Sequence, residues 1–405
     1  MIAWFRYICL IVSLLITLPE LLSAQRLVAQ RQEDVEAGLL YNESVYILSN
    51  YSCLSSNSPE KLSLDELLRK QIEGFYFYLK RDTETNVLLL RKPDGTFTPF
   101  SESLEAIKTA LDADSTKVLT LFLDFYVETE LESSFKEIGL MEYVLEYDTK
   151  NGWPSLKDML SSGKRLVVFE VQKHLNSPSW LHNMRDFVEH TDADWGNQPE
   201  GVESFDERLK KNLSLFTGYK FLETSRGNSN DISALARQTP YLIESFKRAW
   251  IRDGRVPNFV LVDKYYAWLD VSLVTFRNFD IIYGAVTNNN ELLNYVNWDG
   301  MSNYTTGKYC FPLEPGAELM LSPVSPGYRI EPATVYVSGT QRKAFAGDFK
   351  ARPLRIDEDI EIYLPFEGDE KDGSSNHNLT VSRNVEFIQD PIRGQVASLE
   401  NHAGS

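Results

Sequence analysis

The sequence predicts an α/β fold: a TIM-type (β/α) barrel, a β-rich segment and the first strands of a β-sandwich. Short apolar strand-like runs alternate with helix-like stretches over residues 38–290, which is typical of a parallel sheet closed into a barrel. Residues 291–358 are rich in Pro, Gly and short β-type runs without a helical period. Strand-like runs separated by Gly, Asp, Ser and Asn then fill residues 359–405, as in an antiparallel sandwich.

Local signals predict the barrel elements in order. Ser63 and Glu66 form a capping box for a helix that ends before Gly74, and Ser101 can cap a second helix. Pro240 suits the first turn of a long helix. Strands are expected at residues 45–48, 75–79, 87–90, 118–127, 165–169, 213–216 and 259–262. In such barrels the chemistry lies at the carboxyl ends of the strands.

The N-terminus has the pattern of a signal peptide over residues 1–24. Arg6 precedes an apolar run at residues 7–18, and the segment ends in small residues at Ser23 and Ala24. The run is too short to span a bilayer, which needs about 20 apolar residues. A buried N-terminal helix is the alternative. We therefore expect a secreted or cell-surface protein with no transmembrane segment in the mature chain.

Charge and cysteine content narrow the class of protein further. The net charge is −17 and no long Lys/Arg run is present, which argues against a nucleic-acid partner. Removal of the leader removes Cys9 and leaves Cys53 and Cys310. These two can pair as a disulfide in an oxidising compartment, or they can be separate buried thiols.

The residues that carry a family resemblance lie in the alternating region. WPSLKDML at residues 153–160 and GKRLVVF at residues 163–169 resemble the WPTL…GKRLVVF stretch of PLC-like phosphodiesterases, the superfamily of the phosphatidylinositol-specific phospholipase C X domain. YNE at residues 41–43, LFLD at residues 121–124 and GRVPNFVLVDKY at residues 254–265 resemble further family segments in the same order. The resemblance covers residues 38–285 and implies the barrel fold.

The resemblance also implies a catalytic pair of histidines, and this chain lacks them at those places. Counting from residues 41–43, the first histidine falls on Asn50, or on Ser49 after a one-residue slip. The second falls on Arg91. The five histidines lie elsewhere, at His174, His182, His190, His377 and His402, and those at 182 and 190 are expected to face water.

The other family positions are mixed. The family's arginine and aspartate on the second strand fall on Tyr76 and Arg81, whereas Asp124 and Asp263 keep an acidic character. Neither asparagine nor arginine can exchange a proton at neutral pH. The resemblance therefore implies a barrel that has lost the hydrolytic activity and has no cofactor, with Ca²⁺ expected only in an active enzyme, for which Asp124 would be a metal ligand.

The basic residues near the strand ends suggest a binding function. Lys80, Arg81, Arg91 and Lys92 can hold an anionic head group or sugar phosphate without cleaving it, or they can be solvated charges.

The C-terminal residues resemble the opening of a LamG-type, concanavalin A-like sandwich. The resemblance rests on YLPFEGDEKDGSSNHNLTVS at residues 363–382, a strand at residues 384–387 and the turn and strand at residues 394–400. These strands are too few to close a sandwich, so we expect the domain to continue past residue 405. A domain of this type implies a glycan or an extracellular protein as ligand.

Two hypotheses follow. In the first, the barrel is a binding or structural module with a phosphoinositide-like, glycan or extracellular protein ligand. In the second, it is a divergent metal-dependent phosphoric diester hydrolase that uses Asp124 and Asp263. The placement of Asn50 and Arg91 discriminates between them.

Overall fold

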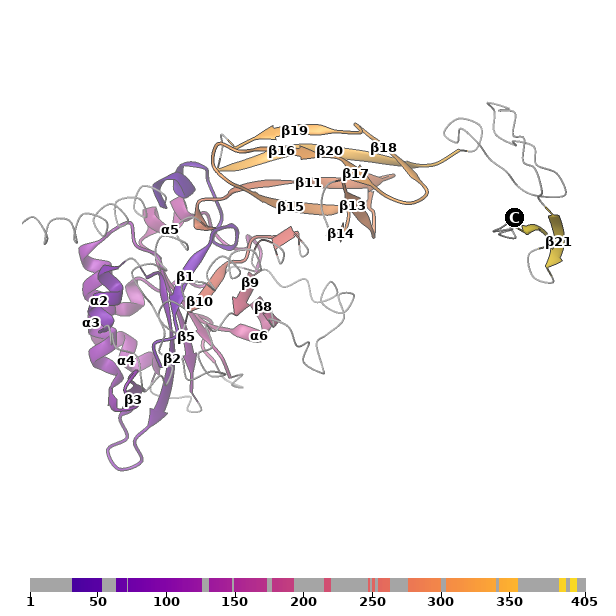
Figure 1. Cartoon of the computed structure of the whole chain (residues 1–405). Helices are drawn as coiled ribbons and strands as arrows, with labels where there is room; N and C mark the ends of the chain where they lie inside the picture. The colour runs from indigo at the N-terminus through magenta and orange to yellow at the C-terminus, as the bar shows by residue number, and fades with distance from the viewer. Residues whose placement is uncertain are drawn as a thin grey trace, which may run out of the picture. The chain divides into compact units, whose positions relative to one another are not determined.

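The computed structural model divides into two compact units (Figure 1). The first comprises Met1–Tyr283, Tyr309–Leu319 and Val337–Ala346, and the second comprises Gly284–Lys308, Met320–Tyr336 and Gly347–Ser405. Within them the structure describes residues 31–52, 63–70, 72–125, 131–147, 149–172, 177–192, 215–219, 247, 250–251, 254–262, 276–299, 304–339, 342–355, 386–390 and 394–398.

A ten-stranded sheet forms the framework of the first unit. Its main path runs in the order β7-β6-β5-β2-β1-β10-β9-β8, and each ladder along this path is parallel. The strands are β1 (Tyr46–Ser49), β2 (Gly74–Arg81), β5 (Leu119–Asp124), β6 (Leu166–Glu170), β7 (Leu181–Asn183), β8 (Val188–Asp192), β9 (Leu215–Tyr219) and β10 (Phe259–Val262). The predicted α/β fold with a parallel sheet is therefore confirmed.

The sheet is curled, as a barrel requires. In the strand order, β10 lies three positions from β5, so a flat sheet would separate Phe259 from Phe122 by about 14 Å. Their ring centroids are instead 5.2 Å apart, and the ring of Phe169 on β6 lies 6.0 Å from that of Phe259. Side chains of distant strands thus meet in an inner core. Within the described residues, no ladder joins β7 to β8.

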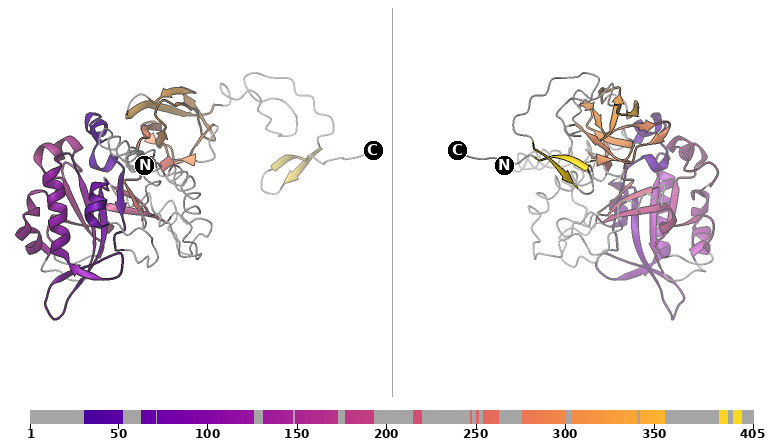
Figure 2. Two further views of the ribbon diagram at one scale, coloured as in Figure 1. Left: turned by 60° about the vertical axis from the view of Figure 1, so that its left-hand side comes forward. Right: turned by 90° about the vertical axis from the view of Figure 1, so that its right-hand side faces the viewer.

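Helices cover the outer face of the sheet (Figures 1 and 2). The apolar face of α3 (Phe100–Ala113) places Leu104, Ile107 and Leu111 in an outer core at 0 % exposure. The alternating side chains Phe75 and Phe77 of β2 enter the same core. The remaining helices are α2 (Leu64–Arg69), α4 (Leu131–Ile138), α5 (Leu156–Ser162), α6 (Met184–Phe187) and the 3-10 segments η1 (Tyr41–Glu43) and η2 (Leu140–Glu142).

Two of the predicted helix starts have different outcomes. The capping box of α2 is confirmed, because Ser63 Oγ accepts from the Glu66 N–H while the Glu66 carboxylate accepts from the Ser63 N–H. The predicted cap at Ser101 is wrong, because α3 begins at Phe100 with Pro99 as its N-cap. Of the helix predicted from Pro240, only the last part lies among the described residues.

A β-hairpin grows out of the parallel sheet. The predicted strand at residues 87–90 exists as β3 (Leu88–Arg91), but it pairs antiparallel with β2 and with β4 (Phe97–Pro99). The chain reverses in a tight turn in which the Asn86 N–H donates to the Asp82 carbonyl and Asn86 has a φ of 62°. So short a connection permits only antiparallel pairing. This strand is therefore an addition to the barrel and not one of its parallel strands.

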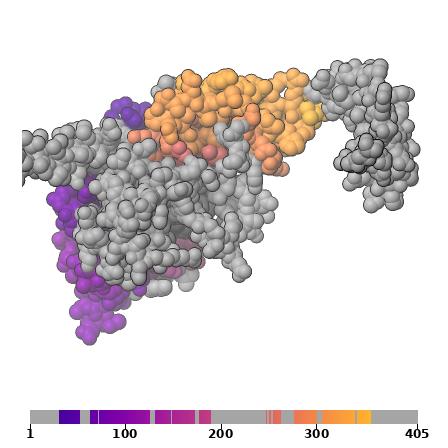
Figure 3. All heavy atoms as spheres, in the orientation of Figure 1, coloured from indigo at the N-terminus to yellow at the C-terminus, as the bar shows by residue number. Residues whose placement is uncertain are grey.

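The region after β10 is β structure, as predicted. In the second unit, β13 pairs antiparallel with β14 and β17, and Trp298 packs on Phe349 with ring centroids 5.9 Å apart. The outer side chains of this β-rich region appear as orange spheres in Figure 3. Its strands are β11 (Asp280–Asn288), β12 (Glu291–Leu292), β13 (Val296–Trp298), β14 (Tyr304–Thr305), β15 (Lys308–Leu313), β16 (Glu318–Leu321), β17 (Pro323–Val324), β18 (Tyr328–Glu331), β19 (Val335–Ser338) and β20 (Lys343–Pro353).

The C-terminal described residues form one hairpin, drawn in yellow in Figure 2. Its strands β21 (Glu386–Asp390) and β22 (Gly394–Ser398) pair antiparallel. The LamG-type assignment stays a prediction, since residues 356–385 lie outside the described residues, and the domain boundaries at 290 and 358 also stay predictions. The predicted signal peptide lies outside the described residues too. None of the described helices is long and apolar enough to cross a membrane.

Candidate functional site

The carboxyl ends of β1, β2, β5 and β6 share one edge of the curled sheet, which we call the mouth. Asn50 directly follows β1 and is half-buried, whereas Ser49 is the last residue of the strand and is 5 % exposed. On β2, Tyr76 and Tyr78 alternate with the outer-core phenylalanines and therefore face inward. Tyr78 is the register partner of Asp124, the last residue of β5.

Asp124 is held in place from two directions. The Tyr76 hydroxyl donates to its Oδ2 at 2.9 Å, and Nε2 of Gln172 donates to its Oδ1 at 3.3 Å. Gln172 lies just beyond β6, so the carboxylate at the end of β5 is bonded from both neighbouring strands, β2 and β6. Each carboxylate oxygen has a further lone pair with which it can accept a hydrogen bond from a hydroxyl group of a ligand.

Arg91 lies on the other side of Tyr78 from Asp124. Its guanidinium carbon is 5.7 Å from the centroid of the Tyr78 ring, a cation–π arrangement at a half-buried position. In the described part of the chain, no carboxylate forms an ion pair with this guanidinium. Its N–H donors therefore remain available for an anion, which a guanidinium can bind through two parallel hydrogen bonds.

The predicted basic residues do not all point the same way. Nζ of Lys80 lies 3.7 Å from the centroid of the Phe97 ring, on the face of the hairpin that also carries Arg91. Arg81 follows Lys80 in β2 and points to the opposite face. Lys92 lies just beyond β3, where the chain turns toward β4. Lys80 and Arg91 are thus the pair that the strand register brings to one face.

His182 is not at the water-exposed position that the sequence predicts. It lies on β7 with 4 % exposure, among the rings of Trp153, Phe169 and Phe187, and its Nε2 lies 3.1 Å from the Leu145 carbonyl. Burial lowers its pKa from 6.5 to about 4, against the opposing effect of the carbonyl. The imidazole is therefore neutral at physiological pH and serves as a core residue.

The side chains of the other four histidines are not among those that the structure describes. The backbone at residue 190 belongs to β8, and residues 174, 377 and 402 lie outside the described residues. Asp263 also lies outside them. Within the described ranges, no group of three or more His, Cys, Asp or Glu side chains is arranged to hold a metal ion.

Of the two cysteines in the predicted disulfide, only Cys310 lies among the described residues. Cys310 is buried, and its Sγ accepts a hydrogen bond from the indole Nε1 of Trp250 at 3.0 Å. Cys53 lies outside the described residues, so the pairing stays a prediction.

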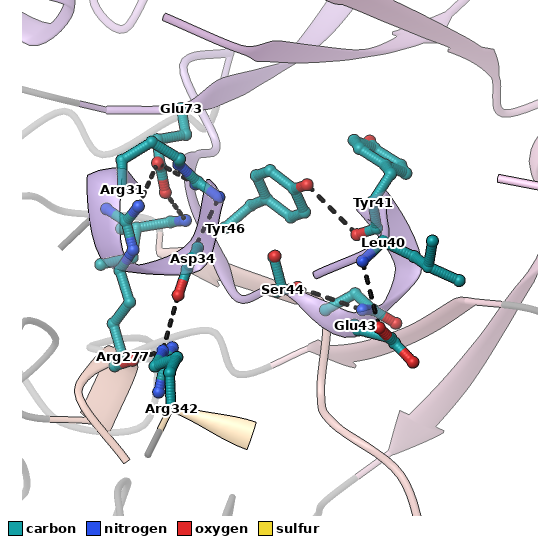
Figure 4. Close-up of polar contacts among 12 residues, drawn as sticks. Arg31, Asp34, Leu40, Tyr41, Glu43, Ser44, Tyr46, Glu73, Arg277 and Arg342 are labelled. Carbon is teal, nitrogen blue, oxygen red and sulfur yellow. Dashed lines mark hydrogen bonds and ion pairs between the residues drawn. The ribbon is translucent and has the colours of Figure 1, made fainter. Parts of the chain in front are cut away.

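A buried ionic cluster lies at the opposite end of the strands from the mouth (Figure 4). Asp34 binds Arg31 at 3.4 Å and Arg342 at 2.6 Å, and Arg31 also forms an ion pair with Glu73. Glu73 precedes β2 and is 3.0 Å from Nη2 of Arg277. Side chains at this amino-terminal face of a barrel stabilise the fold, because the chemistry of such folds lies at the other face.

The pKa values of two arginines in the cluster are shifted in opposite directions. Burial works against the charge of Arg31, but Glu73 and Asp34 outweigh it and raise the pKa of the guanidinium. Burial and the neighbouring Arg31 charge lower the pKa of Arg277 to about 10, which still leaves it charged at neutral pH. Interlocked charges of this kind hold segments in place only as long as every partner is present.

The motif that carries the family resemblance has a structural role here. Trp153 is 3 % exposed in the inner core, and Ser155 caps α5 by accepting from the Asp158 N–H at 3.1 Å. Arg165 donates to three backbone carbonyls between the last turn of α3 and the start of β5, including Asp114 O at 2.6 Å. These residues build the barrel and are independent of any catalytic group at the mouth.

Three residues of the mouth escape the sequence analysis: Tyr78, Gln172 and Ser52. The alternation of Phe75 and Phe77 could have placed Tyr78 on the inner face. No sequence signal indicates Ser52 or Gln172, because their roles depend on how loops cross strand ends.

The comparisons with known proteins give one family match and a set of similar solved structures. The family described as PI-PLC X 1 matches residues 90–199, less than half of the chain. Comparison with curated protein sequences gives no match. A mutant of phosphatidylinositol-specific phospholipase C from Staphylococcus aureus is 13% identical over 60% of this chain and 96% of its own, with a TM-score of 0.37. The phosphatidylinositol-specific phospholipase C from Listeria monocytogenes is 14% identical over 60% of this chain and 98% of its own, with a TM-score of 0.38.

The X-domain match begins within β3 and includes β4, β5, the Trp153 motif, β6, β7 and β8. These are consecutive pieces of the parallel α/β sheet described above. Through residues 90–199 the chain resembles the PI-PLC X family.

Proposed function

We propose that the barrel is a non-hydrolytic module that binds an anionic head group or sugar phosphate at its mouth. The observation that carries the proposal is Arg91, whose guanidinium stacks on Tyr78 without a carboxylate partner in the described residues. Such a group suits a phosphate, which it can contact through two hydrogen bonds.

The rest of the mouth fits the same ligand class. Lys80 supplies a second cation on the face that carries Arg91. Asp124 lies on the far side of Tyr78 and can accept hydroxyl groups of a polyol. A phosphate bound at Arg91 would therefore bring the hydroxyls of its sugar toward the carboxylate.

Loss of hydrolysis follows from the residues at the histidine places. Asn50 and Arg91 cannot move a proton at neutral pH, whereas hydrolysis needs one group to take a proton and another to give it. The absence of one such group costs on the order of 10²–10⁴ in rate. The nearest described imidazole, His182, is buried with its pKa lowered to about 4.

Binding is tested by titrating inositol 1-phosphate and inorganic phosphate into the full chain by calorimetry. We expect Arg91→Ala to weaken binding at least tenfold, since charge-assisted hydrogen bonds are each worth about 1.5–3 kcal/mol. Arg91→Lys keeps the charge but loses the two-bond contact and should give an intermediate affinity. Lys136→Ala, at a side chain that is 62% exposed on α4, is the matched control. Equal affinities of wild type and Arg91→Ala would contradict the proposal.

A second candidate function is a divergent metal-dependent phosphodiesterase. The hydrogen bond from the Tyr76 hydroxyl to Asp124 favours it, because it fixes an acidic side chain at the strand ends. Turnover of a phosphodiester that needs a divalent cation and is lost in Asp124→Ala would establish this function. The non-hydrolytic proposal requires no such turnover above that of buffer.

We also propose that the protein acts outside the cell, where its LamG-like end contacts a glycan or an extracellular protein. The leader-like residues 1–24 and the resemblance of residues 363–400 support this proposal. N-terminal sequencing of protein recovered from the host's medium or cell surface tests it. A cell-associated chain that still begins at Met1 would contradict export with cleavage.

A further inference from the structure

Along the edge of β2 that faces away from β5, the backbone bonds first to β1, then to the side chain of Ser52, and then to β3. Gly74 and Phe75 pair with the end of β1, while β5 occupies the other edge of β2 as far as Tyr78. From Leu79 onward β2 pairs antiparallel with β3. Between these stretches, at Tyr78, neither neighbouring strand provides a ladder partner on that edge.

The hydroxyl of Ser52 fills this place. Ser52 Oγ accepts from the Tyr78 N–H at 2.8 Å and donates to the Arg91 carbonyl at 3.0 Å. Since Leu79 is opposite Leu90 in the ladder, Tyr78 and Arg91 are the next pair along. The hydroxyl thus stands where a direct N–H···O=C bond would otherwise join them.

This insertion sets the position of Arg91. A direct ladder bond would draw β3 close to β2 at Tyr78, whereas the inserted hydroxyl holds the two backbones apart and bonds both. The Arg91 guanidinium lies over the Tyr78 ring of this same pair. Ser52 is 5 % exposed, so water cannot easily replace it.

We infer that Ser52 is a positioning residue, which fixes Arg91 over Tyr78 and so sets the anion-binding geometry of the mouth. It acts through the backbone of Arg91 and does not touch the ligand. It also ties the loop that carries Asn50 to the hairpin, so both histidine places are held by one hydroxyl. The effect of Ser52 on anion binding rests on the proposed function, but its effect on the position of Arg91 can be measured without any ligand.

The first test measures Arg91 in the absence of ligand. The full chain is treated with phenylglyoxal, and modification of the peptide that contains Arg91 is followed by mass spectrometry, together with hydrogen exchange of the Tyr78 amide. In Ser52→Ala we expect both rates to rise about five- to tenfold, because the Tyr78 amide loses its acceptor and β3 loses its tether. Ser52→Thr keeps the hydroxyl and should restore both rates toward those of wild type.

Ser103→Ala is the matched control. Ser103 is 8 % exposed within α3, outside both the hairpin strands and the loop that carries Ser52, and its replacement should leave both rates unchanged even if it lowers the melting temperature. Wild-type rates at Arg91 and Tyr78 in Ser52→Ala would overturn the inference. So would equal increases in Ser52→Ala and Ser103→Ala, since these would indicate general loosening.

The second test measures inorganic phosphate affinity in the same variants. We expect Ser52→Ala to weaken binding about five- to tenfold and Ser52→Thr to bind as wild type. Unchanged affinity in Ser52→Ala, with Arg91 more reactive, would overturn the link between position and binding. If phosphate bound to none of the proteins, the proposed function would fail, while the reactivity of Arg91 would still decide the role of Ser52.

Discussion

At the scale of single residues, His182 and Arg91 show how burial sets charge. Both side chains pack against aromatic rings, but His182 is 4 % exposed and Arg91 is half-buried at a strand end. An imidazole can avoid the desolvation cost of a charge by releasing its proton. A guanidinium stays protonated, so a partly buried one is stabilised by an interaction with an anion or an aromatic ring. The guanidinium of Arg91 packs over the ring of Tyr78, and we propose that its N–H groups bind an anion.

The state of His182 predicts how stability depends on pH. Its pKa in the fold is lowered to about 4 from 6.5, so the unfolded chain takes up the proton first as pH falls. The free energy of unfolding should therefore decrease from about pH 6.5 down to pH 4, by about 3 kcal/mol at most from this group. Denaturant unfolding across this range measures it. His182→Gln should flatten the slope, and equal slopes would contradict the prediction.

A second residue-scale prediction concerns the N-cap of α5. Ser155→Ala removes the acceptor of the Asp158 N–H and should cost about 1 kcal/mol in the free energy of unfolding. Ser161→Ala, within the same helix, is the control and should change the value by less than about 0.5 kcal/mol. If both variants lose the same amount, the cap has no special role.

At the scale of elements, the strands could be predicted from sequence but their directions could not. The runs at residues 165–169 and 259–262 are apolar throughout, as buried parallel strands are, and the structure places strands there. Leu88–Arg91 gives a similar strand signal, yet its direction is set by the turn at Asp82 and Asn86. The period of a strand carries no information on whether its neighbour runs parallel.

The site was predicted less completely than the fold, for the same reason. The family resemblance leads to Asn50, Arg91 and Asp124, because each lies in or beside a strand with an apolar signal. Ser52 bonds residues that are 26 and 39 positions away, so its role follows from the path of the loop and not from its neighbours in sequence. His182 was predicted to face water, because the polar residues around it obscured a three-residue buried strand.

The ion pairs of Asp34 join residues 31–34, at the start of the described chain, to Arg342. Asp34 is 0 % exposed between Arg31 and Arg342, so Asp34→Ala leaves two buried guanidinium groups without this partner. We expect a loss of about 3–5 kcal/mol in the free energy of unfolding. Glu132→Ala, which removes the exposed pair with Lys136 on α4, should cost less than about 1 kcal/mol. Similar losses in the two variants would contradict the prediction.

At the scale of the whole molecule, charge and fold favour different partners from those of a nucleic-acid-binding protein. The chain has a net charge of −17, whereas at the mouth Lys80 and Arg91 share one face. A small anion can approach such a pair within about 10 Å, where salt screens the distant negative charges. A long polyanion would extend over the acidic surface and be repelled.

This contrast can be measured directly. We expect no binding of a labelled single-stranded oligonucleotide to the full chain at about 0.15 M salt, since few phosphates could be neutralised. Fluorescence anisotropy up to the highest soluble protein concentration tests it, with inorganic phosphate titrated in parallel. Saturable oligonucleotide binding would show that a basic surface beyond Lys80 and Arg91 exists.

The cluster in Figure 4 also has a consequence for the order of events during synthesis. Asp34 and Arg342 are 308 residues apart in sequence. A ribosome makes about 5–20 residues each second, so Arg342 is made about 15–60 s after Asp34. Until then the start of the barrel lacks one of its closing charges. Most of the strands of the parallel sheet are therefore synthesised before this ion pair can form.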